Sequence, residues 1–377
     1  MMRVYLDNAA TTPMSSEVID LMTGIMKSDY ANPSSVHHGG RKSKIIIENA
    51  RKTVATFLNT SPGNIFFTSG GTEADNMAIR CGVIDNNIKH AVTSSISHHA
   101  VLYPLEKLKN EGFIDLTYIK IDSNGLIDLV NLEEILKNKP RTFVSIMHAN
   151  NEIGTMQPIK EIGDLCKKYN AIFHSDTVQT IAHYKLDMQA LNIDFITASA
   201  HKFHGPKGVG FIYISENIKI NPLLLGGSQE RNMRAGTENI YAIAGLEKAM
   251  QLSYASMDQD MVYIKGLKKY MISQLTKNID GISFYANSND LDNSLFKVLS
   301  VAFPATPNSE MLLFNLDIMG VSCSGGSACS SGSVGGSHVL NAISVDSQKP
   351  GVRFSFSKYN TIEEIDFTIG KLNEIFN

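Results

Sequence analysis

The sequence has few cysteines and no long hydrophobic run. Its 377 residues include four cysteines, with no CxxC pair. This spacing is not typical of a disulfide-stabilised exported domain or of the usual zinc sites. No apolar run approaches the roughly 18 residues of a membrane-spanning helix, and the first residues lack the apolar stretch of a signal peptide. We therefore expect a cytoplasmic location, reduced thiols, no metal and no membrane partner.

The chain also lacks an excess of charge of either sign. Lys and Arg total 34 against 37 Asp and Glu, which gives a net charge of −3. This balance disfavours a chain that coats nucleic acid or an anionic membrane. Hydrophobic residues make up 43% of the chain and charged residues 19%, so a large core can form and the length suffices for two domains.

Short β-type apolar runs alternate with helical patterns over most of the chain, and such alternation implies a mostly parallel sheet covered by helices on both faces. Strands are predicted at residues 64–68, 90–93, 116–121, 142–147, 171–174, 194–198 and 209–214. Helical patterns intervene at residues 72–82, 101–110, 132–137 and 158–169.

The pattern changes beyond about residue 240. A long helical region at 240–277 is followed by predicted strands at 299–303 and 351–357, a helix near 309–319 and a closing helix at 362–376. We therefore predict an α/β fold with a large domain over residues 16–250 and a smaller α+β domain over 251–377. Residues 1–15 are expected to pack with the smaller domain.

One turn in the predicted large domain is suited to an anion. Gly70, Gly71 and Thr72 follow the strand predicted at 64–68 and open a helix. Glycines permit a tight turn, and the first amides of a helix, together with a threonine hydroxyl, bind phosphate well. An ordinary capped turn explains the same residues. The motif matches neither the usual dinucleotide site nor the usual Mg-nucleotide site.

A lysine and an aspartate each follow another predicted strand. Lys202 stands between His201 and His204, and a lysine amine held in a site can condense with an aldehyde. Asp176 falls at the carboxyl edge of the sheet, where a carboxylate can keep a pyridine nitrogen protonated. A solvated lysine and a helix-capping aspartate are the plainer explanations. With the anion-binding turn in the same domain, the combination favours pyridoxal phosphate.

Seven motifs stand out along the chain: DNAATT at 7–12, NPSS at 32–35, SGGTEADN at 69–76, HANNEIG at 148–154, HK at 201–202, MRAGTEN at 233–239 and GSACS at 326–330. Together they resemble the cysteine desulfurases of NifS/IscS type, within the class V aminotransferase superfamily and fold type I. The resemblance runs from residue 5 to the closing helix. Its most specific part is the cysteine motif, because fold type I relatives with other chemistries lack it.

The resemblance implies pyridoxal 5′-phosphate as cofactor, L-cysteine as substrate and a homodimer. It implies that Lys202 carries the cofactor, that Asp176 pairs with the ring nitrogen and that Gln179 contacts the phenolic oxygen. We place the ring-stacking role on His99, because Ala100 and Val101 follow it, with His98 as the alternative. The implied phosphate contacts are Gly71, Thr72, Ser199, His201 and, from the other subunit, Thr237. The implied substrate contacts are Asn32, Asn151 and Arg353.

Cys329 lies in a stretch, residues 324–337, that is almost entirely Gly and Ser. Such a backbone gives a thiol the mobility to take sulfur in a pocket and present it elsewhere, at an ordering cost of about 1–2 kcal/mol per residue. A small buried hydrophobe is the plainer reading, and the scarcity of apolar neighbours disfavours it. The implied catalytic set is Cys329, Lys202 and His99.

The predicted reaction converts L-cysteine to L-alanine and leaves sulfur on Cys329 as a persulfide. An acceptor or scaffold protein would then take the sulfur, for iron–sulfur cluster assembly or tRNA thiolation. The alternatives are a selenocysteine lyase, another class V aminotransferase, and a non-catalytic partner-binding scaffold.

Overall fold

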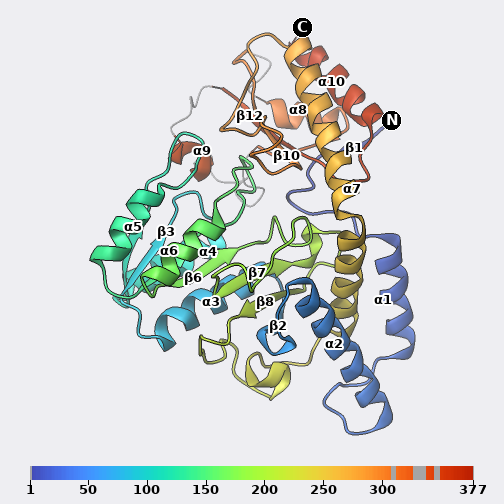
Figure 1. Cartoon of the computed structure of the whole chain (residues 1–377). Coiled ribbons are helices and arrows are strands. Elements are labelled where there is room, and N and C mark those ends of the chain that lie inside the picture. The colour runs from blue at the N-terminus through green and yellow to red at the C-terminus, as the bar shows by residue number, and fades with distance from the viewer. Residues whose placement is uncertain (1, 307–310, 326–336, 344–348, 377) are drawn as a thin grey trace.

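The computed structural model describes residues 2–306, 311–325, 337–343 and 349–376. A large layered part contains a seven-stranded sheet, and a smaller part sits above one end of it (Figure 1). In the large sheet the strand order is β2-β8-β7-β6-β5-β3-β4. These strands are β2 (Ile65–Thr68), β3 (His90–Thr93), β4 (Asp115–Tyr118), β5 (Thr142–Ser145), β6 (Ile172–Asp176), β7 (Phe195–Ser199) and β8 (Gly210–Ile214).

The large sheet is mostly parallel, as the alternation of apolar runs predicted. Only β8 runs against its neighbours, pairing antiparallel with both β2 and β7, while the other pairs are parallel. All these strands except β4 are buried along their whole length. Continuous burial is what a sheet covered on both faces requires.

Helices cover the two faces of this sheet through separate cores. One core joins α3 and α4 to the strands, and the other joins α2, α5, α6 and the first part of α7. Helix α1 packs against α7 as well. The helices of the large part are α1 (Ser16–Ser28), α2 (His38–Phe57), α3 (Gly71–Asp85), α4 (His99–Asn110), α5 (Leu129–Asn138) and α6 (Ile159–Lys168), with the single turn η1 (Pro62–Asn64) before β2.

Helix α7 (Ile240–Asn278) connects the two parts of the molecule (Figure 1). Met250 belongs to the core of the large part, whereas Ile264 and Met271 belong to the core of the smaller part. The division predicted at residue 250 therefore falls inside one continuous helix, and the domain ranges stay a prediction.

The smaller part is built on a three-stranded antiparallel sheet of order β12-β10-β9. A second, two-stranded parallel sheet joins the N-terminal β1 to β11, so the first residues of the chain lie against the smaller part. Its elements are β1 (Val4–Tyr5), β9 (Ser283–Phe284), β10 (Val298–Ala302), α8 (Leu312–Ile318), β11 (Val321–Ser322), α9 (His338–Ala342), β12 (Gly351–Ser355) and α10 (Ile362–Phe376).

Among the described residues, no helix combines the length and the apolar character that crossing a bilayer demands.

Candidate active site

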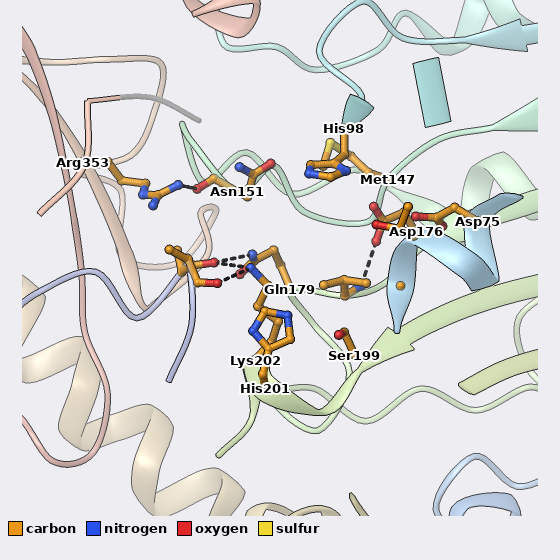
Figure 2. Close-up of a pocket in the computed structure, with 15 residues that line it drawn as sticks. Asp75, His98, Met147, Asn151, Asp176, Gln179, Ser199, His201, Lys202 and Arg353 are labelled. Carbon is orange, nitrogen blue, oxygen red and sulfur yellow. Dashed lines mark hydrogen bonds between the residues drawn. The ribbon is translucent and has the colours of Figure 1, made fainter. Parts of the chain in front are cut away.

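A cavity of about 240 Å³ lies at one edge of the large sheet (Figure 2). The start of α3 supplies Gly71 and Thr72, the end of β6 supplies Asp176, and the single turn η2 (Ala200–Lys202) supplies His201 and Lys202. The strands β2, β6 and β7 run parallel, so the turns that follow their carboxyl ends meet at the same edge. The three sequence motifs therefore share one pocket.

The start of α3 forms an anion cradle in this pocket. Gly70 precedes the helix at φ 150°, a backbone conformation that favours glycine. A Cβ added at Gly71 would fall 2.7 Å from Cγ2 of Val178, so the chain passes too closely here for a side chain. Thr72 and Ser199 line the same hollow. Unpaired amides at a helix N-terminus and nearby hydroxyls fit a phosphate group.

Asp176 brings a buried carboxylate to the same cavity. The side chain is 7% exposed, and Oδ1 accepts a hydrogen bond of 2.9 Å from the Val178 amide. The pKa of Asp176 is raised to about 6, mainly by burial and also by the charge of Asp75, while His98 acts to lower it. Burial disfavours the charged form of a carboxylate, so a neighbouring cation stabilises that form strongly. The protonated nitrogen of a pyridine ring satisfies that requirement.

Asp75 is a pocket residue that the sequence analysis did not single out. It lies on α3, is 1% exposed, and accepts a 2.7 Å hydrogen bond from Oγ1 of Thr197. His174 Nε2 lies 3.3 Å from Asp75 Oδ1, and its Nδ1 lies 2.8 Å from Oγ of Ser145. Burial raises the pKa of Asp75 to about 7 and lowers that of His174 to about 4. The two groups therefore favour their neutral forms.

Backbone carbonyls of the N-terminal segment hold the Lys202 amine. Nζ of Lys202 donates to the carbonyl oxygens of Ala9 at 2.7 Å and of Ala10 at 2.8 Å (Figure 2). The Gln179 side-chain amide donates to the Ala9 carbonyl at 3.0 Å. His183 Nε2 lies 3.0 Å from the backbone oxygen of Lys202, and this contact helps to hold the turn η2 in place. These contacts direct the lysine amine into the pocket.

Arg353 closes the pocket from the smaller part of the molecule. Its guanidinium is 2% exposed and donates to the Asn151 carbonyl at 3.0 Å and to Oδ1 of Asp7 at 2.6 Å (Figure 2). Its Nε finds no acceptor among the described residues. A guanidinium that retains a buried donor is suited to binding a carboxylate. Asn151 and Arg353, both expected at the substrate, line the same cavity.

The structure corrects the choice between two histidines. The ring of His98, and not that of His99, lines the pocket. His98 caps α4, with Nδ1 accepting from the Ala100 amide at 3.1 Å, and this position turns its ring toward the cavity. His99 stacks on Tyr103 at 4.7 Å and contacts His338 at 4.5 Å instead. The placement of His99 in the pocket is therefore wrong, and His98 is the histidine that lies where a ring-stacking residue is expected; the stacking role itself stays a prediction. Burial lowers the pKa of His98.

Two expected contacts lie outside the pocket of this chain. Asn32 is exposed in the loop before α2, and Thr237 is exposed in the loop before α7, where it lines a separate hollow with Glu230 and Arg234. Neither side chain lines the cavity. Cys329 lies outside the described residues.

The three cysteines that the structure describes are poor nucleophiles. Cys81 and Cys166 are buried, and Cys323 is partly buried after β11. Burial raises the pKa of Cys81 to about 11 and that of Cys323 to about 12, and it raises the pKa of Cys166 as well. A thiol attacks as its thiolate, so these residues suit packing rather than sulfur transfer. None of the three lines the cavity.

Comparison with known proteins agrees with this geometry. The model of the family Aminotransferase class-V matches residues 4–367. The cysteine desulfurase IscS of Dictyoglomus turgidum is 43% identical, over 99% of this chain and 94% of that protein. A solved structure of a NifS-like protein superposes with a TM-score of 0.90 at 36% identity and covers 99% of both chains. A second solved structure, named SspA in complex with cysteine, superposes with a TM-score of 0.82 at 32% identity. The match covers 96% of this chain and 100% of that chain.

These similarities extend over nearly the whole chain and confirm the resemblance carried by the seven motifs. The observed fold, with its large parallel sheet and its lysine, aspartate and arginine in one cavity, accords with them. The chain belongs to the cysteine desulfurase family of NifS/IscS type, within the class-V aminotransferases.

Proposed function

We propose that the protein is a pyridoxal-phosphate-dependent cysteine desulfurase that converts L-cysteine to L-alanine and passes the sulfur on. The observation that carries this proposal is the shared pocket of Lys202, Asp176 and Arg353. An amine that can bind an aldehyde, a carboxylate for a ring nitrogen and a guanidinium for a carboxylate are the groups that cofactor and amino acid together require.

The cradle residues would hold the cofactor. Thr72, Ser199 and His201 would bind its phosphate, Asp176 would face its ring nitrogen, and Lys202 would bind its aldehyde. When bound, pyridoxal phosphate supplies an electron sink that stabilises negative charge developing on the amino acid. Burial keeps the Asp176 contact strong, because water competes poorly for it.

The arginine and the neighbouring asparagine orient the substrate. Arg353 can form paired hydrogen bonds with the substrate carboxylate, and the Asn151 side chain lies at the same wall of the cavity. Fixing the carboxylate sets the direction of the bond from Cα to its hydrogen, which positions the substrate for proton removal.

Lys202 and His98 serve the proton transfers in this proposal. The Lys202 amine, which the Ala9 and Ala10 carbonyls hold at the pocket, would accept the Cα proton of the substrate. Burial lowers the pKa of His98, so its imidazole is neutral at pH 7 and can accept or return a proton.

Cys329 takes the sulfur in the final step. Its thiolate attacks the substrate sulfur, the carbon–sulfur bond breaks with its electron pair moving to Cβ, and protonation of Cβ gives alanine. Cys329 keeps the sulfur as a persulfide, so no external oxidant is needed. This assignment is supported by the motif around Cys329 and by the raised thiol pKa values of the three described cysteines.

A homodimer is part of the proposal. Val36 and Leu225 are 88% and 85% exposed, and Val36 lines a hollow together with residues 228–231. Apolar side chains so exposed favour burial against a second copy. Such a dimer would bring Asn32 and Thr237 toward the partner's pocket, where the family resemblance expects them. Light scattering should give the dimer mass, and Leu225→Glu should shift the protein to monomer with loss of cofactor affinity.

The sulfur acceptor and the cellular location belong to the same proposal. An iron–sulfur scaffold or a tRNA-thiolation protein would discharge Cys329, and the absence of a disulfide-type cysteine pattern in the sequence favours the cytoplasm. Trapping the persulfide enzyme with candidate acceptors and measuring its discharge would identify the recipient. The IscS protein and the NifS-like structure compared above favour desulfuration over a selenocysteine lyase, aminotransferase or scaffold function.

Turnover of L-cysteine tests the function. With a thiol reductant present, the cofactor-bound protein should release alanine and sulfide in equal amounts. Cys329→Ser should keep the visible cofactor band and lose sulfide release, whereas the matched Cys323→Ser should retain both. Cofactor-bound protein that produces neither product contradicts the proposed function, and full turnover by Cys329→Ser contradicts the choice of nucleophile.

A further inference from the structure

The N-terminal segment Asp7–Ala10 crosses between the two parts of the molecule at the pocket. On the side of the smaller part, the Ala9 amide donates to Oγ of Ser355 at 2.8 Å, and Asn8 donates to the Ser355 carbonyl at 2.9 Å. On the other side, the carbonyls of Ala9 and Ala10 accept from Lys202. The segment is therefore fixed at both ends, and Asp7 is not part of a loose chain terminus.

Asp7 contacts the guanidinium that faces the substrate site. Its Oδ1 accepts from Nη2 of Arg353 at 2.6 Å, with side-chain exposures of 16% for Asp7 and 2% for Arg353. The backbone is tied at the same place, because Asp7 bridges to Ser355, two residues beyond the arginine on β12. The carboxylate and the arginine thus come from opposite ends of the chain and meet at the wall of the cavity.

The remaining donors of Arg353 show why this contact matters. A guanidinium has five N–H donors, and the contacts with Asp7 and the Asn151 carbonyl occupy two of them, one on Nη2 and one on Nη1. The buried Nε has no acceptor among the residues that the structure describes. A long side chain with unsatisfied donors could rotate to seek partners. Two fixed acceptors remove that freedom before a ligand arrives, which lowers the entropy cost of binding.

We propose that Asp7 is a positioning residue that holds the Arg353 guanidinium in the orientation that binds the substrate carboxylate. The inference rests on the proposed function, in which Arg353 binds the carboxylate of L-cysteine. Asp7 acts through Arg353 and does not touch the substrate. The orientation of Arg353 depends on the geometry of this hydrogen bond and not on the charge of Asp7. An uncharged acceptor of the same shape should therefore preserve most of that orientation.

A competing view makes the opposite prediction. If the negative charge of Asp7 merely competes with the substrate carboxylate for Arg353, removing Asp7 should tighten ligand binding. If Asp7 positions Arg353, Asp7→Ala should weaken binding, while Asp7→Asn, whose Oδ1 can still accept from Nη2, should bind nearly as the wild type does. The two variants therefore separate orientation from charge.

The test titrates cofactor-bound protein with L-alanine, the proposed product, and follows the visible cofactor band. We expect Asp7→Ala to raise the Kd about tenfold or more, since small misplacements of a binding group carry penalties of that order. Asp7→Asn should stay within about threefold of the wild type. In an Arg353→Ala background, Asp7→Ala should change the Kd less than about twofold, because coupled residues are not additive. Asp20→Asn, on the exposed face of α1, is the matched control for loss of one charge and should leave the Kd unchanged.

Several outcomes overturn the inference. Tighter binding by Asp7→Ala, or an equal loss with and without Arg353, shows that Asp7 does not act through the arginine. Failure of the wild type to bind alanine overturns it too. Melting temperatures of the cofactor-bound variants separate misfolding from a binding effect, and Asp7→Asn provides a nearly isosteric variant if Asp7→Ala does not fold. The titration needs no turnover, so absence of sulfide from the wild type contradicts the proposed function alone.

Discussion

A buried ion pair between Arg51 and Glu230 should be a main support of the loop that carries Thr237. Arg51 lies on α2, and Glu230 lies on the single turn η3 (Gln229–Asn232). Two hydrogen bonds of 2.7 and 2.8 Å join them, with exposures of 1% for Arg51 and 4% for Glu230. Glu230 also accepts from the Phe67 amide at 2.8 Å, which ties the loop to β2.

The backbone of η3 is strained, so the contacts of Arg51 and Glu230 are needed to hold it in its conformation. Glu230, Arg231 and Asn232 have φ values of 43°, 56° and 66°, three successive residues in the left-handed region. Each such residue costs on the order of 1–2 kcal/mol, so surrounding contacts must hold the turn in place. The ion pair and the contact with the Phe67 amide supply that constraint.

Glu230→Gln should therefore reduce the free energy of unfolding by about 3 kcal/mol. Removing one partner of a buried pair costs roughly 3–5 kcal/mol because the other charge stays buried without compensation. We expect a loss at the lower end of this range, because Glu48 still contacts Arg51 Nε at 3.2 Å and offsets part of its charge. The double variant Arg51→Met/Glu230→Leu removes both charges and should recover part of the loss.

Urea unfolding of the cofactor-free protein measures this prediction. Glu48→Gln is the control, because the Glu48 side chain is 40% exposed and its pair should contribute less than about 1 kcal/mol. A loss below about 1 kcal/mol for Glu230→Gln, or a double variant less stable than Glu230→Gln, would refute the reasoning.

Three further predictions concern the pocket. Asp75 contributes stability that is present below about pH 4 and is lost as pH rises toward 7, because folded Asp75, with its pKa raised by burial from 3.8 to about 7, keeps a proton that the unfolded chain releases. This contribution amounts to roughly 4 kcal/mol at most, so the difference in free energy of unfolding between the cofactor-free wild type and Asp75→Asn should shift toward the variant as pH rises from about 4 to about 7; a difference that does not change with pH contradicts the assignment. Gly71→Ala should lower stability by about 1–3 kcal/mol and weaken cofactor binding in a spectroscopic titration, because its Cβ would fall 2.7 Å from Val178; wild-type affinity and stability would show that the turn relaxes freely. His98→Ala should lower kcat at least about a hundredfold while His99→Ala leaves it within about threefold, and the reverse order in a sulfide assay would restore the original choice of His99.

The large sheet could be predicted because its strands carry their own signal. The sequence predicts a strand at or near each of the seven observed strands, and six of them are buried along their whole length, whereas β4 (Asp115–Tyr118) has no buried residue. The reversed direction of β8 has no such signal, since an apolar run looks the same in either direction. The strands β1, β9 and β11 have two residues each, and their pairing is decided by packing in the smaller part.

The site residues could be predicted where a reactive side chain follows a strand. They could not be predicted where a backbone group or the burial of a side chain determines its role. Lys202 and Asp176 fall at strand ends, so chemistry and position agree in the sequence. The carbonyls that hold Lys202 have no sequence signature, because every residue offers one. Asp75 lies on a buried helix face, where spacing alone suggests packing. His98 and His99 differ only in where α4 begins, and a helix start is uncertain by a residue or two.

Mass analysis of the cysteine peptides after reaction tests the central claim most directly. The cofactor-bound protein is given L-cysteine without a reductant, its thiols are blocked, and the peptides of Cys329 and Cys323 are compared. Our account predicts one added sulfur atom on the Cys329 peptide, none on the Cys323 peptide, and one alanine formed for each sulfur retained. Alanine formation with sulfur absent from Cys329, or carried by Cys323 instead, would contradict it.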